Sequence, residues 1–135
     1  MADAAKAVCR EAAAHRKDVG QIRDVIAGLA DALPDVCINA IGPQVSPYII
    51  NMSFLGVKGE ILVHALSQKN IYVSMGAACR SRKRAKPALE LMGFSQEIAQ
   101  SAIRFSFSPY NTVTEAETAR EIIIEEVTKF RKVLR

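Results

Sequence analysis

Two residues of this 135-residue chain have the type and the setting to do chemistry, Cys79 and Arg104. Small residues (76–78) precede Cys79 and the cationic sequence 80–82 follows it, and nearby positive charge favours the nucleophilic thiolate. Arg104 is the one charge in the alternating run Ile103–Phe107, where a strand would hold its guanidinium as a rigid fork for a carboxylate. The pattern indicates a nucleophile and a carboxylate ligand. A loop thiol without function and a solvent-facing or ion-paired strand arginine are the ordinary alternatives.

The remaining cysteines and the histidines carry weaker signals. Cys9 and Cys37 fall in a predicted helix and a predicted strand, where packing is the expected role. The three cysteines form no C-x-x-C pair, so neither a disulfide framework nor a zinc site is expected, and a reducing compartment, the cytoplasm, fits them. His15 and His64 have no second ligand at metal spacing, so we expect surface or helix-face histidines and no metal.

Positive charge is concentrated in one segment. The net charge is +4, and the five cations within 80–86 account for more than all of it, leaving −1 for the rest. Such a run attracts acidic partners, so a stand-alone binding module for an acidic protein or nucleic acid is one hypothesis. A nucleic-acid partner is the less expected of the two, because the chain has no Trp and no aromatic cluster for stacking bases.

The helices that must position these residues follow from apolar periodicity. An Ala-rich start leads into an amphipathic stripe that ends before Pro34, and further helices are expected over 60–68, between Pro87 and Gly93, and after Ser95. Thr114 with Glu117 forms a capping box for the last helix. The first stripe comprises Val19, Ile22, Ile26, Leu29 and Leu33, and the last Ala116, Ala119, Ile123, Val127, Phe130 and Leu134.

Four short runs have strand character: 36–38, 48–54, 71–73 and 103–107. The segment 74–86 has no apolar periodicity and is interpreted as a mobile loop that carries Cys79. The elements predict a small α/β (α+β) domain over 1–135, with a three- or four-stranded sheet covered by helices on one side. No apolar stretch is long enough for a membrane span, and the first residues lack the apolar core of a signal peptide.

Several motifs in register resemble one family. They are Asn51-Met52-Ser53-Phe54, Gly59-Glu60-Ile61-Leu62, Val73-Ser74-Met75-Gly76-Ala77-Ala78-Cys79 and Ser101-Ala102-Ile103-Arg104-Phe105-Ser106. In this order and spacing they resemble the C-terminal domain of NifS-like cysteine desulfurases. These are pyridoxal-phosphate enzymes of fold type I in the class V aminotransferase group. The resemblance covers nearly the whole chain and implies the small domain of that fold.

The resemblance also implies roles. Cys79 matches the family's catalytic cysteine, which takes sulfur from L-cysteine as a persulfide and releases alanine. Arg104 matches the arginine that binds the substrate carboxylate, and the loop through Lys86 would carry the sulfur to an acceptor or scaffold protein. Iron–sulfur cluster assembly or thiolation would use that sulfur, and a homodimer is the family's usual state. A selenocysteine lyase, or another class V aminotransferase, is the alternative within the group.

The chain departs from the family pattern in places. Met75 and Ala77 stand where the family usually has serines, and Ser108-Pro109 where a glycine and a basic residue are common. The Schiff-base lysine and phosphate cup belong to a large preceding domain in the family, and nothing in this sequence replaces them. We therefore expect an isolated chain that is inactive alone, with pyridoxal phosphate held by the absent large domain.

Overall fold

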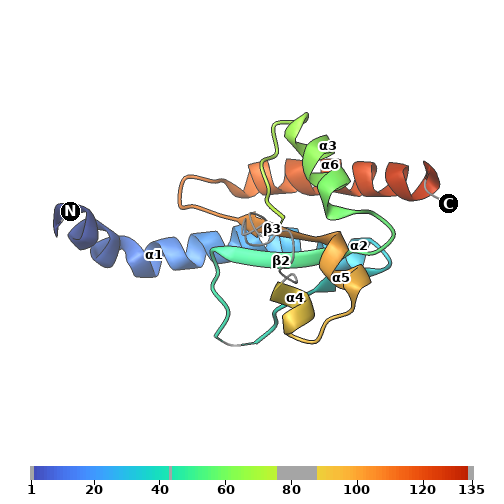
Figure 1. The fold of residues 1–135 in the computed structure, drawn as a ribbon. Helices are drawn as coiled ribbons and strands as arrows, with labels where there is room; N and C mark the ends of the chain where they lie inside the picture. The colour runs from blue at the N-terminus through green and yellow to red at the C-terminus, as the bar shows by residue number, and fades with distance from the viewer. Residues whose placement is uncertain (1, 43, 76–87, 134–135) are drawn as a thin grey trace.

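Three short strands form the sheet that carries Arg104. The computed structural model describes residues 2–42, 44–75 and 88–133, with side chains from His15 onward. Its strands are β1 (Val36–Ile38), β2 (Ile49–Phe54) and β3 (Ala102–Ser106), all antiparallel in the order β1-β2-β3 (Figure 1). The expected small sheet is confirmed in its three-stranded form.

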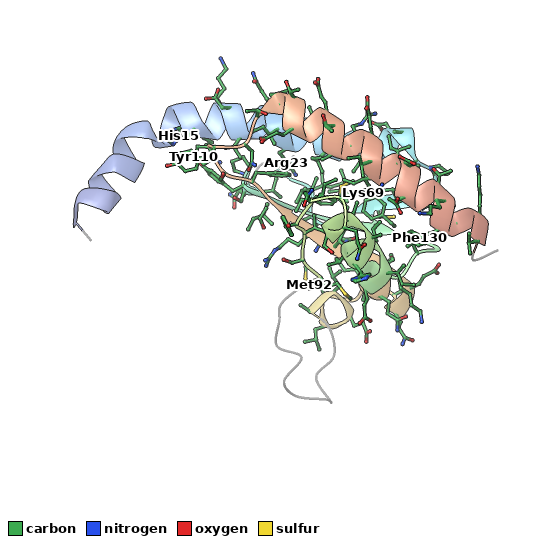
Figure 2. The ribbon with its side chains drawn as sticks, turned by 90° about the horizontal axis from the view of Figure 1, so that it is seen from above. His15, Arg23, Lys69, Met92, Tyr110 and Phe130 are labelled. Carbon is green, nitrogen blue, oxygen red and sulfur yellow. The ribbon has the colours of Figure 1, made fainter. Side chains whose placement is uncertain are left out.

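Four helices cover one face of the sheet: α1 (Ala2–Ala27), α2 (Leu29–Ala32), α3 (Gly59–Ser67) and α6 (Val113–Val133). Helices α1 and α6 run side by side over this face (Figure 2). The apolar faces of these helices pack against the apolar face of β2 and β3, because burying both faces removes apolar area from water. The first predicted stripe is buried throughout. The core includes Ile22, Ile26, Leu29, Leu33, Ile50, Met52, Phe54, Leu62, Leu66, Ile103, Phe105, Ile123 and Val127.

Two short helices lie on the opposite face of the sheet, α4 (Ala88–Leu91) and α5 (Gln96–Ser101) (Figure 1). The prediction of helices on one side only was therefore wrong. The cap of α5 is the expected one, with Ser95 Oγ accepting from Ile98 N at 3.3 Å. Hydrogen bonding anchors α5 to β2, because Ser53 Oγ donates to Ile98 O at 2.8 Å. A polar side chain on the outer face of β2 thus recruits a second layer, which apolar periodicity does not reveal.

The strand predicted over 71–73 was wrong. Ile71 N donates to Leu66 O at 3.0 Å, so it closes the end of α3 instead of joining a sheet. Asn70 is the expected stop, with φ of 60°. The segment then passes the edge of β3 and pairs there at a single bridge, Ser74 with Arg104. High β-propensity indicates only that side chains suit a half-buried pleated surface. A strand also needs a partner strand in register.

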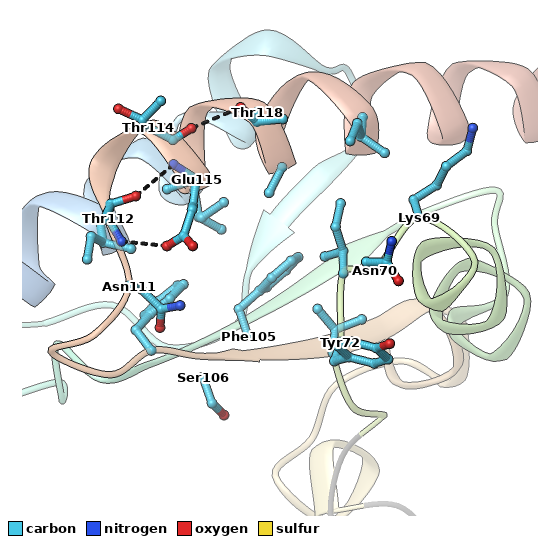
Figure 3. A pocket seen from close by; sticks show the side chains of 18 residues that line it. Lys69, Asn70, Tyr72, Phe105, Ser106, Asn111, Thr112, Thr114, Glu115 and Thr118 are labelled. Atoms are coloured by element: carbon cyan, nitrogen blue, oxygen red, sulfur yellow. Dashed lines mark hydrogen bonds between the residues drawn. The ribbon is translucent and has the colours of Figure 1, made fainter.

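Helix α6 begins two residues earlier than predicted. Its capping box is Thr112 with Glu115: Thr112 N donates to Glu115 Oε2 at 2.7 Å, and Glu115 N donates to Thr112 Oγ1 at 3.1 Å (Figure 3). The predicted pair, Thr114 and Glu117, was wrong because two Thr-x-x-Glu patterns overlap here and either satisfies the spacing rule. Inside the helix, Thr114 O instead accepts from Thr118 Oγ1 at 3.0 Å.

Arg131 joins the end of α6 to the sheet. Its guanidinium donates to Leu55 O at 3.0 Å, Pro34 O at 2.6 Å and Asp35 O at 3.1 Å, three carbonyls around the start of β1 and the end of β2. We expect Arg131→Met to lower the free energy of unfolding by about 1–2 kcal/mol, because part of the lost bonding is replaced by water. Urea unfolding measures this, with the exposed Lys132→Met as control. Equal losses in both variants would contradict a role for the three bonds.

Candidate functional site

Arg104 lies on the sheet face opposite the apolar core. Its neighbours Ile103 and Phe105 are buried in the core, and strand alternation places the half-buried Arg104 on the other side. Figure 3 shows the same alternation one step along, with Phe105 and Ser106 pointing to opposite sides of the strand. The strand setting predicted for Arg104 is confirmed.

A row of polar residues crosses the sheet on the side of Arg104. Asn51 is the direct antiparallel partner of Arg104, and Asn39 N donates to Asn51 O at 2.9 Å, which continues the register toward β1. On the other edge, Arg104 N donates to Ser74 O at 2.6 Å and Ser74 N donates to Arg104 O at 3.1 Å. Directly paired residues share one face, so Asn39, Asn51, Arg104 and Ser74 form a continuous line, here called the polar row.

Side-chain hydrogen bonds fix part of the polar row. Asn39 Nδ2 donates to Asn51 Oδ1 at 2.6 Å and to Ser53 Oγ at 2.8 Å. Asn39 and Ser53 are both buried, so these bonds are formed away from water. Two hydrogen bonds donated by one amide nitrogen hold Asn39, Asn51 and Ser53 in one arrangement. The β1 end of the row is therefore rigid.

The guanidinium of Arg104 has no hydrogen-bond partner for its buried Nε among the described residues. A buried guanidinium N–H without an acceptor costs free energy, and a carboxylate that reaches it gains charge-assisted, bidentate hydrogen bonds. The arrangement can therefore bind an anion. A ligand carboxylate would meet this guanidinium on the outer face of the sheet.

Cys79 and the basic run 80–86 lie outside the described residues. The structure describes the chain that leads to Cys79 as far as Met75, and its last paired residue, Ser74, lies beside Arg104. The described chain resumes at α4, on the outer side of the sheet (Figure 1).

The secondary candidates have structural or surface positions. Cys37 is a half-buried free thiol in β1, paired with Ser53, so it lies on the outer face of the sheet. Strand alternation gives the core positions to Val36 and Ile38 instead. His64 is exposed on α3 and His15 is half-buried on α1, whereas the side chain of Cys9 lies outside the described part. Among the described residues, no cluster of three His, Cys, Asp or Glu could hold a metal ion.

A cavity of about 580 Å³ lies on the core side of the sheet and is distinct from the polar row. Its lining includes Tyr72, Phe105 and Phe107 from the sheet side and Glu115 and Ala119 from α6 (Figure 3). Arg104 does not line it. The Glu115 carboxylate is engaged in capping α6, and the other charged residue in the lining is Lys69, which follows α3.

The sequence matches one family model over most of its length. Residues 4–118 match the model described as "Aminotransferase class-V", and the chain belongs to that family. Within it, the chain is similar to proteins named "Cysteine desulfurase IscS". It is 35% identical over 136 residues to that of Methylococcus capsulatus, covering 98% of this chain and 33% of the relative. For Pseudomonas aeruginosa the identity is 33% over 135 residues with the same coverage, and for Vibrio cholerae 40% over 108 residues, covering 76% and 26%.

Solved structures agree with this assignment. A "NifS-like protein" superposes with a TM-score of 0.76 at 26% identity, covering 90% of this chain and 30% of that one. A NifS-like protein from Rickettsia africae gives a TM-score of 0.64 at 24% identity, covering 84% and 29%, and supports the fold alone. The predicted fold and the predicted resemblance to a NifS-like class V enzyme fragment are confirmed. The chain spans about a third of the length of the curated relatives it matches.

Asn39 and Asn51 are the site residues that sequence reasoning missed. Asn51 begins the motif Asn51-Met52-Ser53-Phe54, in which it was given no role, and Asn39 follows the short strand β1. The alternation along β2 could have indicated that Asn51 lies on the polar face, because Asn51 and Ser53 alternate with the apolar Met52 and Phe54. Nothing in the sequence, however, indicates that Asn39 would join them.

In the described residues, no helix is both long and apolar enough to cross a membrane.

Proposed function

We propose that this chain is the C-terminal domain of a cysteine desulfurase, in which Cys79 carries sulfur and Arg104 binds the carboxylate of L-cysteine. The observation that carries the proposal is the buried Arg104 Nε, which has no hydrogen-bond partner among the described residues and belongs to a residue that pairs with the segment leading to Cys79. Cys79 is five positions after Ser74, so covalent geometry limits the distance between their Cα atoms to at most about 18 Å. The relatives' names support the reaction class.

The proposed reaction transfers one sulfur atom. The Cys79 thiolate attacks the sulfur of the substrate, a sulfur–sulfur bond forms as the substrate's carbon–sulfur bond breaks, and Cys79 becomes a persulfide. The electron pair of the broken bond stays on carbon, where a proton is added to give alanine. Arg104 contributes by holding the substrate carboxylate, which fixes the direction from which the sulfur faces the thiolate.

Pyridoxal phosphate is implied by family membership, and it would supply the electron sink for breaking the carbon–sulfur bond. The described residues of this chain do not fit its site. Lys69 is exposed at the end of α3 and lines the cavity on the core side, away from Arg104, and Lys58 is exposed before α3. The two thirds of the relatives that this chain does not match would hold the cofactor.

The wider setting follows from the same proposal. An acceptor or scaffold protein would take the persulfide sulfur for iron–sulfur cluster assembly or thiolation, in the cytoplasm, and the whole enzyme would be a homodimer. These statements rest on the likeness to IscS proteins.

A fusion protein tests the proposal. The cofactor-binding two thirds of the Methylococcus capsulatus relative are joined to the N-terminus of this chain, and alanine release from L-cysteine is measured. We expect release from the fusion and none from the chain alone. The visible absorption of bound pyridoxal phosphate reports whether the fusion is assembled. An assembled fusion that releases no alanine would contradict the proposal, and release from selenocysteine alone would indicate a selenocysteine lyase.

A further inference from the structure

The polar row contains a second hydrogen-bond donor whose orientation is fixed by a chain of hydrogen bonds. The chain starts at Ser53, whose hydroxyl has a single hydrogen and donates it to Ile98 O at 2.8 Å. Ser53 Oγ can therefore only accept from Asn39. The group of Asn39 that faces it, at 2.8 Å, must be the amide nitrogen, Nδ2. The orientation of the Asn39 amide is thus set by the carbonyl of α5.

The orientation of Asn51 follows from that of Asn39. A side-chain amide nitrogen has two hydrogens, and Asn39 Nδ2 uses the second on Asn51 Oδ1 at 2.6 Å. Asn51 thus turns its oxygen toward β1 and its own Nδ2 away from β1. Within the described residues, Asn51 Nδ2 makes no hydrogen bond. It is a donor held in place without an acceptor.

This donor lies next to Arg104. Asn51 and Arg104 are direct antiparallel partners, which places their Cβ atoms roughly 4.5–5.5 Å apart on one face. The buried Nε of Arg104 also has no acceptor in the part of the chain that the structure describes. Two neighbouring donors, one charged and one neutral, and no acceptor between them match the two oxygens of a carboxylate.

The cost of burying Asn39 is a second observation. Asn39 is 8% exposed, and its Oδ1 is buried without a hydrogen-bond partner among the described residues. Leaving such an acceptor unsatisfied costs about 1–3 kcal/mol, which an apolar residue at this position would avoid. A buried polar group kept at that cost calls for an explanation other than stability. Holding Asn51 in one orientation provides one.

We infer that Asn51 is a second ligand of the substrate carboxylate, donating from Nδ2 beside the guanidinium of Arg104, and that Asn39 is its positioning residue. This inference rests on the proposed function, since it assigns the same carboxylate to both side chains. The neutral donor of Asn51 would fix how the carboxylate is rotated relative to the plane of the guanidinium. Arg104 supplies the charge, and Asn51 supplies a third contact that selects one pose.

The test observes both donors directly in the 135-residue chain. The nitrogen-15 NMR signals of Arg104 Nε–H and the Asn51 side-chain amide are followed while L-alanine is added. L-Alanine carries the α-carboxylate of the substrate without its thiol, and alaninamide, which lacks the carboxylate, is the control ligand. We expect both signals to shift with one dissociation constant for L-alanine and neither to shift with alaninamide.

Variants separate the contact from its positioning. Asn51→Leu removes the donor and adds no charge beside Arg104, so we expect L-alanine to bind about tenfold more weakly or worse. Asn39→Leu leaves the donor but frees its orientation, and we expect roughly threefold to tenfold weaker binding. Ser106→Ala, on the same face of β3 and outside the hydrogen-bond chain, should bind L-alanine like the unaltered protein.

The outcomes distinguish this inference from the proposed function. A shift at Arg104 without one at Asn51 would overturn the role of Asn51 and leave the carboxylate role of Arg104 standing. Equal responses to L-alanine and alaninamide would overturn the inference, because the carboxylate would not be the group recognised. No shift at either residue would overturn both the inference and the role of Arg104. These readings use the unaltered chain and hold even if a variant fails to fold.

Discussion

Cys79→Ser is expected to reduce alanine release from L-cysteine by at least roughly 10³-fold in the fused enzyme. A serine hydroxyl is not ionised near neutral pH and is a poor nucleophile toward sulfur, so the carbon–sulfur bond is not broken by attack. The substrate carboxylate should still bind, because Arg104 is unchanged. The measurement is the alanine released per enzyme, together with the absorption of bound pyridoxal phosphate.

Two other cysteines serve as controls for this prediction. Cys9→Ser and Cys37→Ser lie in α1 and β1, outside the proposed machinery, and each should release alanine like the unaltered fusion. Persulfide formed on the protein should be detected at residue 79 by mass spectrometry of peptides. Alanine release by the Cys79→Ser fusion at the unaltered rate would refute the sulfur-carrier role.

Arg104→Ala is expected to lower kcat/KM for L-cysteine by about 10²–10³-fold. The variant removes a charge-assisted, two-point contact in a partly desolvated site, and losses of this kind amount to about 3–4 kcal/mol. Arg104→Lys keeps the charge but not the fork, so we expect an intermediate loss. Steady-state kinetics of the fused enzyme, with thermal unfolding as a check on folding, measure both.

The strand itself supplies the control for Arg104. Ser106→Ala changes an exposed residue on the same face of β3 and should leave kcat/KM unchanged. A loss in Arg104→Ala that appears only as a lower melting temperature, with KM and kcat intact where the protein is folded, would assign Arg104 a structural role. The contrast between the two β3 positions therefore separates substrate binding from sheet stability.

The site was predictable in part, and the predictable part is local. Alternation of apolar and polar residues along 103–107 predicted the face on which Arg104 lies, since strand geometry depends on the residue's own neighbours. The composition around Cys79 indicated reactivity, and that role stays a prediction because the residue lies outside the described part. The place of Asn39 in the polar row was not predictable, because it depends on hydrogen-bond partners 12 and 14 positions away that only strand pairing brings together.

The local elements of this protein could be predicted from its residues alone: the apolar stripe from Val19 to Leu33, the β1 strand, the Ser95 cap and the alternation within β3. Each depends on periodicity or on a cap within a few residues. The tertiary structure alone decided that 71–73 would end α3 instead of forming a strand, and that α4 and α5 would cover the outer face. It also decided that Asn39, Asn51, Arg104 and Ser74 would form one row. Such outcomes depend on which distant groups compete for the same hydrogen bonds and the same surface, and that competition is resolved only when the chain has folded.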